Sequence, residues 1–187
     1  MKKIKVVVEG IEMSLPAEAL KTPTDSAPFI SGHGPIASSM VKQFVKAKYP
    51  SVVCSVKSES FAGGNSLTVW VSNPDGSSID LLIYNDIKRF ADLFQYGHFD
   101  GMDDCYHYDK TSGTTTDKGT PIEAGVKYVH TDNRPMFGTV GDCVRMLKGM
   151  MAGEYVWGPV SLETAIVKIL GYKVPQSNID KALVYIK

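Results

Sequence analysis

The sequence has no excess of charge of either sign, since Lys+Arg and Asp+Glu number 20 each in 187 residues. A protein that binds nucleic acid regardless of sequence needs a basic surface, and a protein that imitates DNA needs an acidic one. The balance argues against both classes. Nucleic acid stays open as a partner through a local patch, but the net charge does not favour it.

Cysteine is scarce, with only Cys54, Cys105 and Cys143, which lie far apart and form no CxxC pair. This usage argues against a disulfide framework and for a reducing compartment, with the thiols buried as small apolar groups. Long apolar runs are also absent: the first ends at Val8, and none approaches the roughly 18 residues of a membrane-spanning helix. We therefore expect a cytoplasmic protein with no membrane partner.

The centre of the chain has the pattern of a β-hairpin. Residues 52–57 and 67–72 read as strands, and the segment SESFAGG between them reads as a loop whose glycines permit positive φ. In the second strand Leu67, Val69 and Val71 share the face expected to pack on a helix. Trp70 points to the opposite face, where either the C-terminal helices or a partner would cover it.

Helical periodicity on both sides of this hairpin predicts an α+β fold: a mainly antiparallel sheet around the central hairpin with helices packed on it, plus a C-terminal helical extension. The predicted domains are a core at residues 1–153 and an extension at 154–187 that packs on it. Further strands are expected at residues 4–8, 105–108 and 126–130. Helices are expected at residues 35–49, 86–96, 139–153, 161–171 and 178–186, where Gly97 stops the second and Thr139 and Asn178 cap the third and the last. Residues 14–34 read as a linker with at most one helical turn at 17–20.

The order and wording of several segments resemble a known family. The strings KYPSVVCSVKSESFAGGNSLTVWVS and YGHFDGMDDCYHYD, followed by GVKYV and Arg134, resemble the large polyvalent protein-associated domains of phages and conjugative elements. The resemblance covers about residues 35–137. The sequence departs from the family pattern at Lys57, where an arginine is expected, and at the NPDGSS turn.

The resemblance implies a biological context. Polyvalent proteins belong to invading mobile genetic elements, and several of their domains counter host defence. In this context our first hypothesis is a non-enzymatic protein in the cytoplasm of the host cell that binds and inhibits a host defence component, of the anti-CRISPR or antirestriction type. Its expected partner is a host protein, and no cofactor is expected. A homodimer is also open, because exposed strand edges favour pairing.

The candidate binding residues come from the hairpin and from the aromatic side chains near it. Consecutive glycines in a loop can expose backbone amides, and aromatic rings beside a cation can anchor a protein or stack bases. Tyr108 belongs to the same aromatic pattern. The predicted binding residues are Lys57, Ser58, Glu59, Phe61, Asn65, Trp70, Tyr106 and Arg134.

A cluster of His and Asp within ten residues supports two alternatives from other classes. Imidazole and carboxylate groups together suit a divalent metal ion, and the cluster holds five candidate ligands, His98, Asp100, Asp103, Asp104 and His107. The predicted ligands are His98, Asp100, Asp104 and His107. In the alternative without a metal, Asp100 makes a turn and Asp103 is solvated. With a metal site, the protein would be a metal-dependent or nucleic-acid-processing enzyme. The other alternative is a nucleic-acid-binding accessory module that uses the Trp70 face.

Overall fold

The computed structural model describes residues 2–20, 33–108, 114–154, 161, 164–166 and 174–186. The chain divides into two compact units, each described separately below. Unit 1 comprises Met1–Pro50, Val56–Val69 and Leu81–Thr131; unit 2 comprises Ser51–Ser55, Trp70–Asp80 and Asp132–Lys187. The fold class is α+β, as predicted. None of the described helices is both long and apolar enough to cross a membrane.

An N-terminal hairpin opens unit 1. Strands β1 (Lys3–Val8) and β2 (Ile11–Pro16) pair antiparallel, and both turn residues, Glu9 and Gly10, have positive φ, which suits a tight hairpin turn. The 3₁₀ turn η1 (Ala17–Leu20) follows where one was expected. The prediction of a linker was wrong for residues 14–16, which belong to β2. In this strand Met13 and Leu15 alternate with polar residues and are fully buried.

Two long-range contacts hold this hairpin in unit 1. Gln43, from helix α1 (His33–Lys48), binds both backbone groups of Ser14: its Oε1 accepts from the amide at 2.7 Å and its Nε2 donates to the carbonyl at 3.1 Å. At the turn, the Asp117 carboxylate accepts hydrogen bonds from the amides of Glu9 at 2.8 Å and Gly10 at 3.0 Å. The hairpin is thus fastened by side chains from distant parts of the chain.

Helices α1 and α2 (Leu81–Asp92) share the main apolar core of unit 1. Their predicted stripes are confirmed, and the rings of Phe44 and Phe90 stack with centroids 4.0 Å apart and planes within 7°. Both rings are fully buried. Helix α2 begins at Leu81, five residues before the predicted start at residue 86, and in its first turn Leu82 is 80% exposed.

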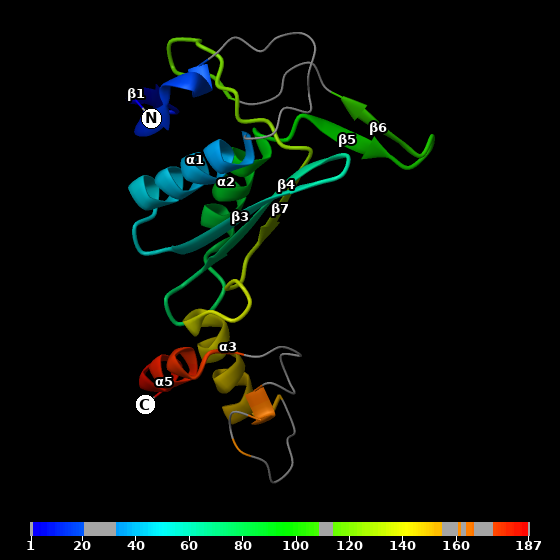
Figure 1. The fold of residues 1–187 in the computed structure, drawn as a ribbon. Coiled ribbons are helices and arrows are strands. Elements are labelled where there is room, and N and C mark those ends of the chain that lie inside the picture. Colours follow the sequence, from blue (N-terminus) through cyan, green and yellow to red (C-terminus); the bar gives the residue numbers. More distant parts are fainter. Residues whose placement is uncertain are drawn as a thin grey trace. The chain divides into compact units, whose positions relative to one another are not determined.

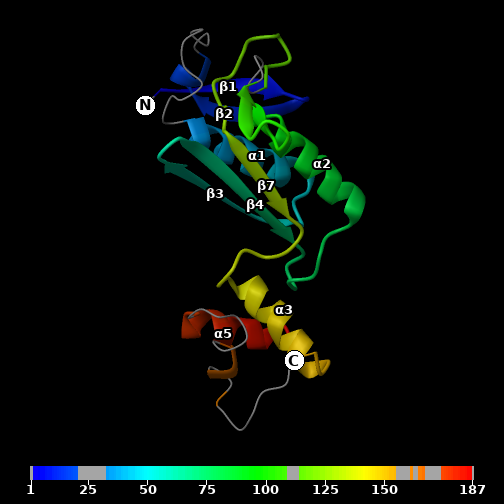
Figure 2. The ribbon, with the colours of Figure 1, turned by 90° about the vertical axis from the view of Figure 1, so that its right-hand side faces the viewer.

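The central sheet has the strand order β3-β4-β7, formed by β3 (Val53–Phe61), β4 (Gly64–Ser72) and β7 (Tyr128–Asp132). Helices α1 and α2 lie on one side of it (Figure 1), and the other face is turned to the viewer in Figure 2, where β7 runs in the same direction as β4. Two parallel strands need a long crossover connection, and the chain between β4 and β7 provides one through α2. Leu67, Val69 and Val71 are fully buried, as predicted.

The predicted SESFAGG loop was wrong, because residues 58–61 continue strand β3 and the turn is only Ala62 and Gly63. Gly63 has a φ of 93°, so the glycine serves the tight turn rather than an open loop. A longer β3 places the side chains of Lys57, Glu59 and Phe61 on one face of the strand at every second residue.

A second hairpin of unit 1 consists of β5 (Gly97–Asp100) and β6 (Cys105–Tyr108), paired antiparallel. The prediction that Gly97 stops α2 was wrong, since α2 ends at Asp92 and Gly97 begins β5. Glycine is needed there for packing: a Cβ atom would overlap the carbonyl oxygen of His107 and the ring of Tyr106.

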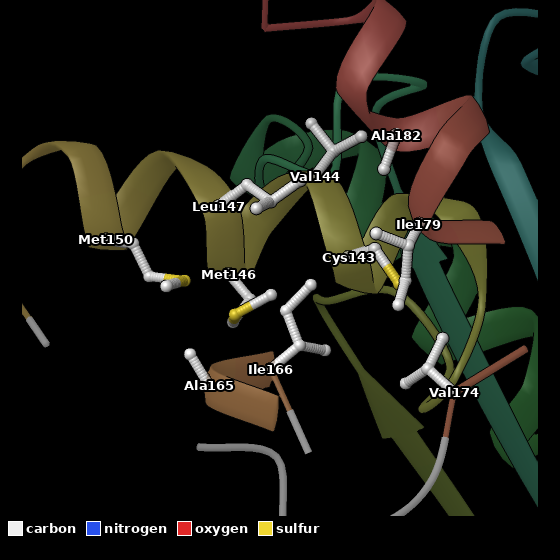
Figure 3. Close-up of a cluster of buried hydrophobic side chains, with 10 residues drawn as sticks. All are labelled: Cys143, Val144, Met146, Leu147, Met150, Ala165, Ile166, Val174, Ile179 and Ala182. Atoms are coloured by element: carbon white, nitrogen blue, oxygen red, sulfur yellow. The ribbon is translucent and has the colours of Figure 1, made fainter. Parts of the chain in front are cut away.

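Unit 2 has its own apolar core around helices α3 (Val140–Met151) and α5 (Gln176–Val184), drawn in Figure 3. Thr139 caps α3 as predicted, because its side-chain oxygen accepts a hydrogen bond from the Asp142 amide at 3.3 Å.

Asn178 is not a helix cap, because α5 begins two residues earlier and the Asn178 side chain donates to the Gly138 carbonyl at 2.9 Å. Of the helix expected at 161–171, residues 164–166 are helical and most others lie outside the described residues. The domain boundary at residue 153 stays a prediction.

Candidate binding surface and metal-ligand cluster

An aromatic cluster with a cation stands on the sheet of unit 1. We define it as Phe61 of β3, Tyr128 of β7, Tyr106 of β6 and Lys127. The rings of Phe61 and Tyr128 stack at 6.2 Å, and Tyr106 meets Tyr128 edge-on at 5.4 Å. The Lys127 Nζ lies 4.7 Å from the Tyr106 ring centre and 5.4 Å from that of Tyr128. Phe61 and Tyr128 are 47% and 40% exposed, so a large part of this stacked pair faces solvent.

Hydrogen bonds between side chains and the backbone hold the aromatic cluster in place. The Tyr106 hydroxyl donates to the Lys127 carbonyl, and the Lys127 amide donates to Asn65 Oδ1 at 2.8 Å. The Lys127 ammonium donates to the Gly63 carbonyl at 3.0 Å, which ties it to the β3–β4 turn. Asn65, on β4, is therefore not a member of the aromatic cluster but holds Lys127 in position.

The other predicted binding residues of unit 1 divide between two faces of β3. Lys57 and Glu59 form an exposed ion pair with 2.6 Å between Nζ and Oε1, on the same face as Phe61. Ser58 is half-buried on the opposite face, where a Cβ atom at Gly34 of α1 would lie 3.0 Å from the Ser58 Cβ. Ser58 therefore packs against a helix.

Trp70 and Arg134 belong to unit 2. Arg134 binds the Asp132 carboxylate at 3.2 Å and lies 4.2 Å from the Phe137 ring centre. Trp70 is half-buried and lines a pocket of about 310 Å³ together with apolar and small polar side chains. Its indole N–H is buried and has no hydrogen-bond partner in the part of the chain that the structure describes. The pocket is lined by Val53, Ser55, Trp70, Ser72, Asn73, Pro74, Pro135, Met136, Thr139, Val140, Gly141 and Tyr185.

The β5–β6 hairpin brings part of the predicted metal set together. Asp100, Asp103 and His107 each offer a ligand atom, and these atoms lie within 4.8 Å of one another. His107 Nε2 is 2.8 Å from Asp103 Oδ2, and this hydrogen bond lowers the pKa of the Asp103 carboxyl. The His98 ring stacks on His107 with centroids 5.6 Å apart. Asp104 stands outside the group at the end of the turn, with a φ of 56°.

The prediction from the sequence left Lys127 and Tyr128 out of the aromatic surface and Asp103 out of the four predicted ligands. The alternation of the strand around Tyr128 was readable, but nothing local indicated that β7 would lie beside β4. Asp103 was one of the five candidate ligands, but composition alone does not distinguish the two neighbouring aspartates of a turn.

The three thiols are expected to differ in reactivity, and Cys105 corrects the prediction of uniform burial. Cys143 is buried, and desolvation together with the neighbouring Asp142 carboxylate raises its pKa to about 11, whereas Cys105 is exposed and Cys54 is half-buried. Since the thiolate is the reactive form, a disulfide reagent at pH 8 should modify Cys105 rapidly and Cys143 only after unfolding. Cys105→Ser should remove the rapid phase. A rapid phase that persists in this variant would contradict the assignment.

The fold defines a small α+β domain in which two helices back a three-stranded sheet that carries an exposed aromatic cluster. The chain belongs to the large polyvalent protein associated domain 29 family, whose model matches residues 34–136, more than half of the sequence. The predicted family and span are confirmed, and with them the origin in a phage or other mobile genetic element. No curated protein and no solved structure shows a significant match to the chain.

Proposed function

We propose that the protein binds and inhibits a component of host defence, in the manner of an anti-CRISPR or antirestriction protein, and catalyses no reaction. The aromatic cluster is the observation that carries the proposal, as the surface that contacts the host protein. Tyrosine and other aromatic residues supply most of the binding energy in many protein interfaces, and they are rarely left exposed together without use.

The geometry of the cluster favours a protein ligand because the side chains are already held in place. Lys127 is bound to Gly63 and Asn65, and Tyr106 is bound to the Lys127 carbonyl. Binding through such groups costs little conformational entropy, which raises affinity for a given contact area. The Lys57–Glu59 pair on the same face of β3 provides the polar rim that such interfaces usually have.

The test is phage infection of host strains that carry a single defence system, compared with matched strains that lack it. Expression of the protein should raise plating efficiency only where the defence system is present. The double variant Phe61→Ala/Tyr128→Ala should lose at least about tenfold of this protection, because it removes two exposed rings of the aromatic cluster. The purified host component should bind the wild type and not the double variant.

The matched control is Leu81→Ala/Leu82→Ala, which also removes two exposed apolar side chains, 64% and 80% exposed, but from α2. This variant should protect as well as the wild type. Equal loss of protection in both double variants would refute a role for the aromatic cluster. A protein that protects against none of the host's known defence systems would count against the function itself.

A second candidate function is the binding of single-stranded nucleic acid, which the position of Lys127 over two tyrosine rings favours. Bases stack on such rings while a cation contacts the backbone. Fluorescence anisotropy with labelled single strands at about 50 and about 200 mM salt distinguishes nucleic-acid binding from protein binding, because contacts to phosphates weaken steeply as the salt concentration rises. Salt-sensitive binding that the Phe61→Ala/Tyr128→Ala variant loses would favour this alternative.

A further inference from the structure

The β5–β6 hairpin has two chemically different faces. In an antiparallel pair, residues directly opposite each other point to the same side, and so do residues two apart along a strand. His98 stands opposite His107, and Asp100 stands opposite Cys105. All four side chains therefore lie on one face, and every one of them is a residue type that binds metal ions.

The other face attaches the hairpin to the rest of unit 1. It presents Tyr106, whose hydroxyl binds the Lys127 carbonyl and whose ring contacts Tyr96 and Tyr128 at 6.4 and 5.4 Å. Gly97 permits the close approach of the two strands on this side. Because Tyr106 fixes one face, the face with the two histidines is presented to solvent, where His98 and His107 are both exposed.

The distances on the exposed face suit a single ion. Ligand atoms of Asp100, Asp103 and His107 lie within 4.8 Å of one another, and the His98 ring is stacked beside that of His107. A zinc ion holds imidazole nitrogen at about 2.0–2.1 Å and carboxylate oxygen at about 2.0–2.2 Å, so two of its ligands lie about 3–3.5 Å apart. Exposed side chains reach that spacing by small rotations about their side-chain bonds.

The donor set selects the class of metal. Two imidazoles with two carboxylates suit borderline ions such as Zn²⁺, whereas Ca²⁺ and Mg²⁺ take oxygen ligands almost alone. Residues 97–108 contain three aspartates and neither lysine nor arginine, so the local charge also attracts a cation. The hydrogen bond between His107 and Asp103 is of the kind that a metal ion replaces by binding both groups.

We propose that this hairpin binds one divalent transition-metal ion, with Zn²⁺ as its representative, through Asp100, Asp103, His107 and His98. The site is independent of the proposed binding of a host protein. It differs from the set predicted from the sequence in one ligand, with Asp103 in the place of Asp104.

Equilibrium dialysis of the full chain with Zn²⁺, after treatment with a chelator, tests the proposal. The wild type should bind one Zn²⁺ ion per chain. An excess of Mg²⁺ or Ca²⁺ of about a hundredfold should not displace it. His107→Ala and Asp103→Asn should each weaken binding by at least about tenfold. Because these side chains are exposed, their loss should leave circular dichroism spectra unchanged.

The matched controls are Asp104→Asn, next in sequence to Asp103, and His130→Ala, an exposed histidine on β7. Both should bind Zn²⁺ as the wild type does. The absence of stoichiometric binding, or binding by His107→Ala at wild-type affinity, would overturn the proposal. So would equal weakening by Asp104→Asn.

Cobalt as a spectroscopic substitute identifies the fourth ligand. With His98 in that position, the Co²⁺ complex should show tetrahedral ligand-field bands without a thiolate charge-transfer band, and Cys105→Ser should not change the spectrum. His98→Ala should weaken binding. A thiolate band that Cys105→Ser abolishes would overturn the assignment of His98, because Cys105 stands on the same face opposite Asp100.

Discussion

Phe44→Ala is expected to lower the free energy of unfolding by about 3–5 kcal/mol. The Phe44 ring is fully buried, stacks on Phe90 at 4.0 Å and meets Tyr49 edge-on at 6.3 Å. Truncation removes the transfer free energy of the ring and leaves a cavity between α1 and α2, which two rigid helices fill poorly. Urea denaturation followed by circular dichroism measures the loss.

Leu82→Ala on α2 is the matched control for this prediction. Leu82 is 80% exposed, so its truncation should change the free energy of unfolding by less than about 0.5 kcal/mol. A loss below about 1 kcal/mol in Phe44→Ala would contradict the stacked core, because it would require the ring to be solvated or its site to collapse without cost.

Gly76→Ala is expected to destabilise unit 2 by about 2–4 kcal/mol, through backbone strain and a steric overlap. Gly76 has a φ of 77°, and an added Cβ would overlap the Gly141 carbonyl oxygen and lie 3.0 Å from the Arg145 amide nitrogen. Both contacts are with the backbone of α3, which cannot move aside without breaking the helix. Urea denaturation and amide hydrogen exchange in α3 both report the loss.

Gly153→Ala separates the two causes. Gly153 also has a φ of 77° and belongs to unit 2, but a Cβ there meets no atom of the described residues within 4 Å. It should therefore cost only the strain of positive φ, about 1 kcal/mol. Equal losses in the two variants would show that the approach of Gly76 to α3 is looser than its geometry indicates.

The helices were the part of the fold that the sequence predicted best. Phe44 and Phe90 each belong to an apolar stripe with helical period, and a stripe is a local property. Strand β2 was missed because Pro16 and the neighbouring prolines suggested a linker, although a proline is tolerated at the end of an edge strand. The parallel position of β7 beside β4 depends on the path of the intervening chain, which no short segment encodes.

The candidate sites show the same limit. Phe61 and Tyr106 were predicted as parts of one aromatic surface, but Lys127 and Tyr128 join them only because β7 pairs with β4. Trp70 was grouped with them by strand alternation and belongs instead to unit 2. The alternation gave the correct face of each strand, whereas the choice of Asp103 over Asp104 depended on a backbone turn with positive φ at Asp104.

The fastening of the N-terminal hairpin has a consequence for how this family is delimited. Residues 2–20 precede the family match, which begins at residue 34, yet Met13 and Leu15 are buried in unit 1 and Asp117, inside the match, binds the turn between β1 and β2. The segment that the family model matches is therefore shorter than the compact unit to which it contributes. A protein cut at the bounds of the match would lose the hairpin that Gln43 and Asp117 bind, and it would expose the apolar surface that Met13 and Leu15 cover.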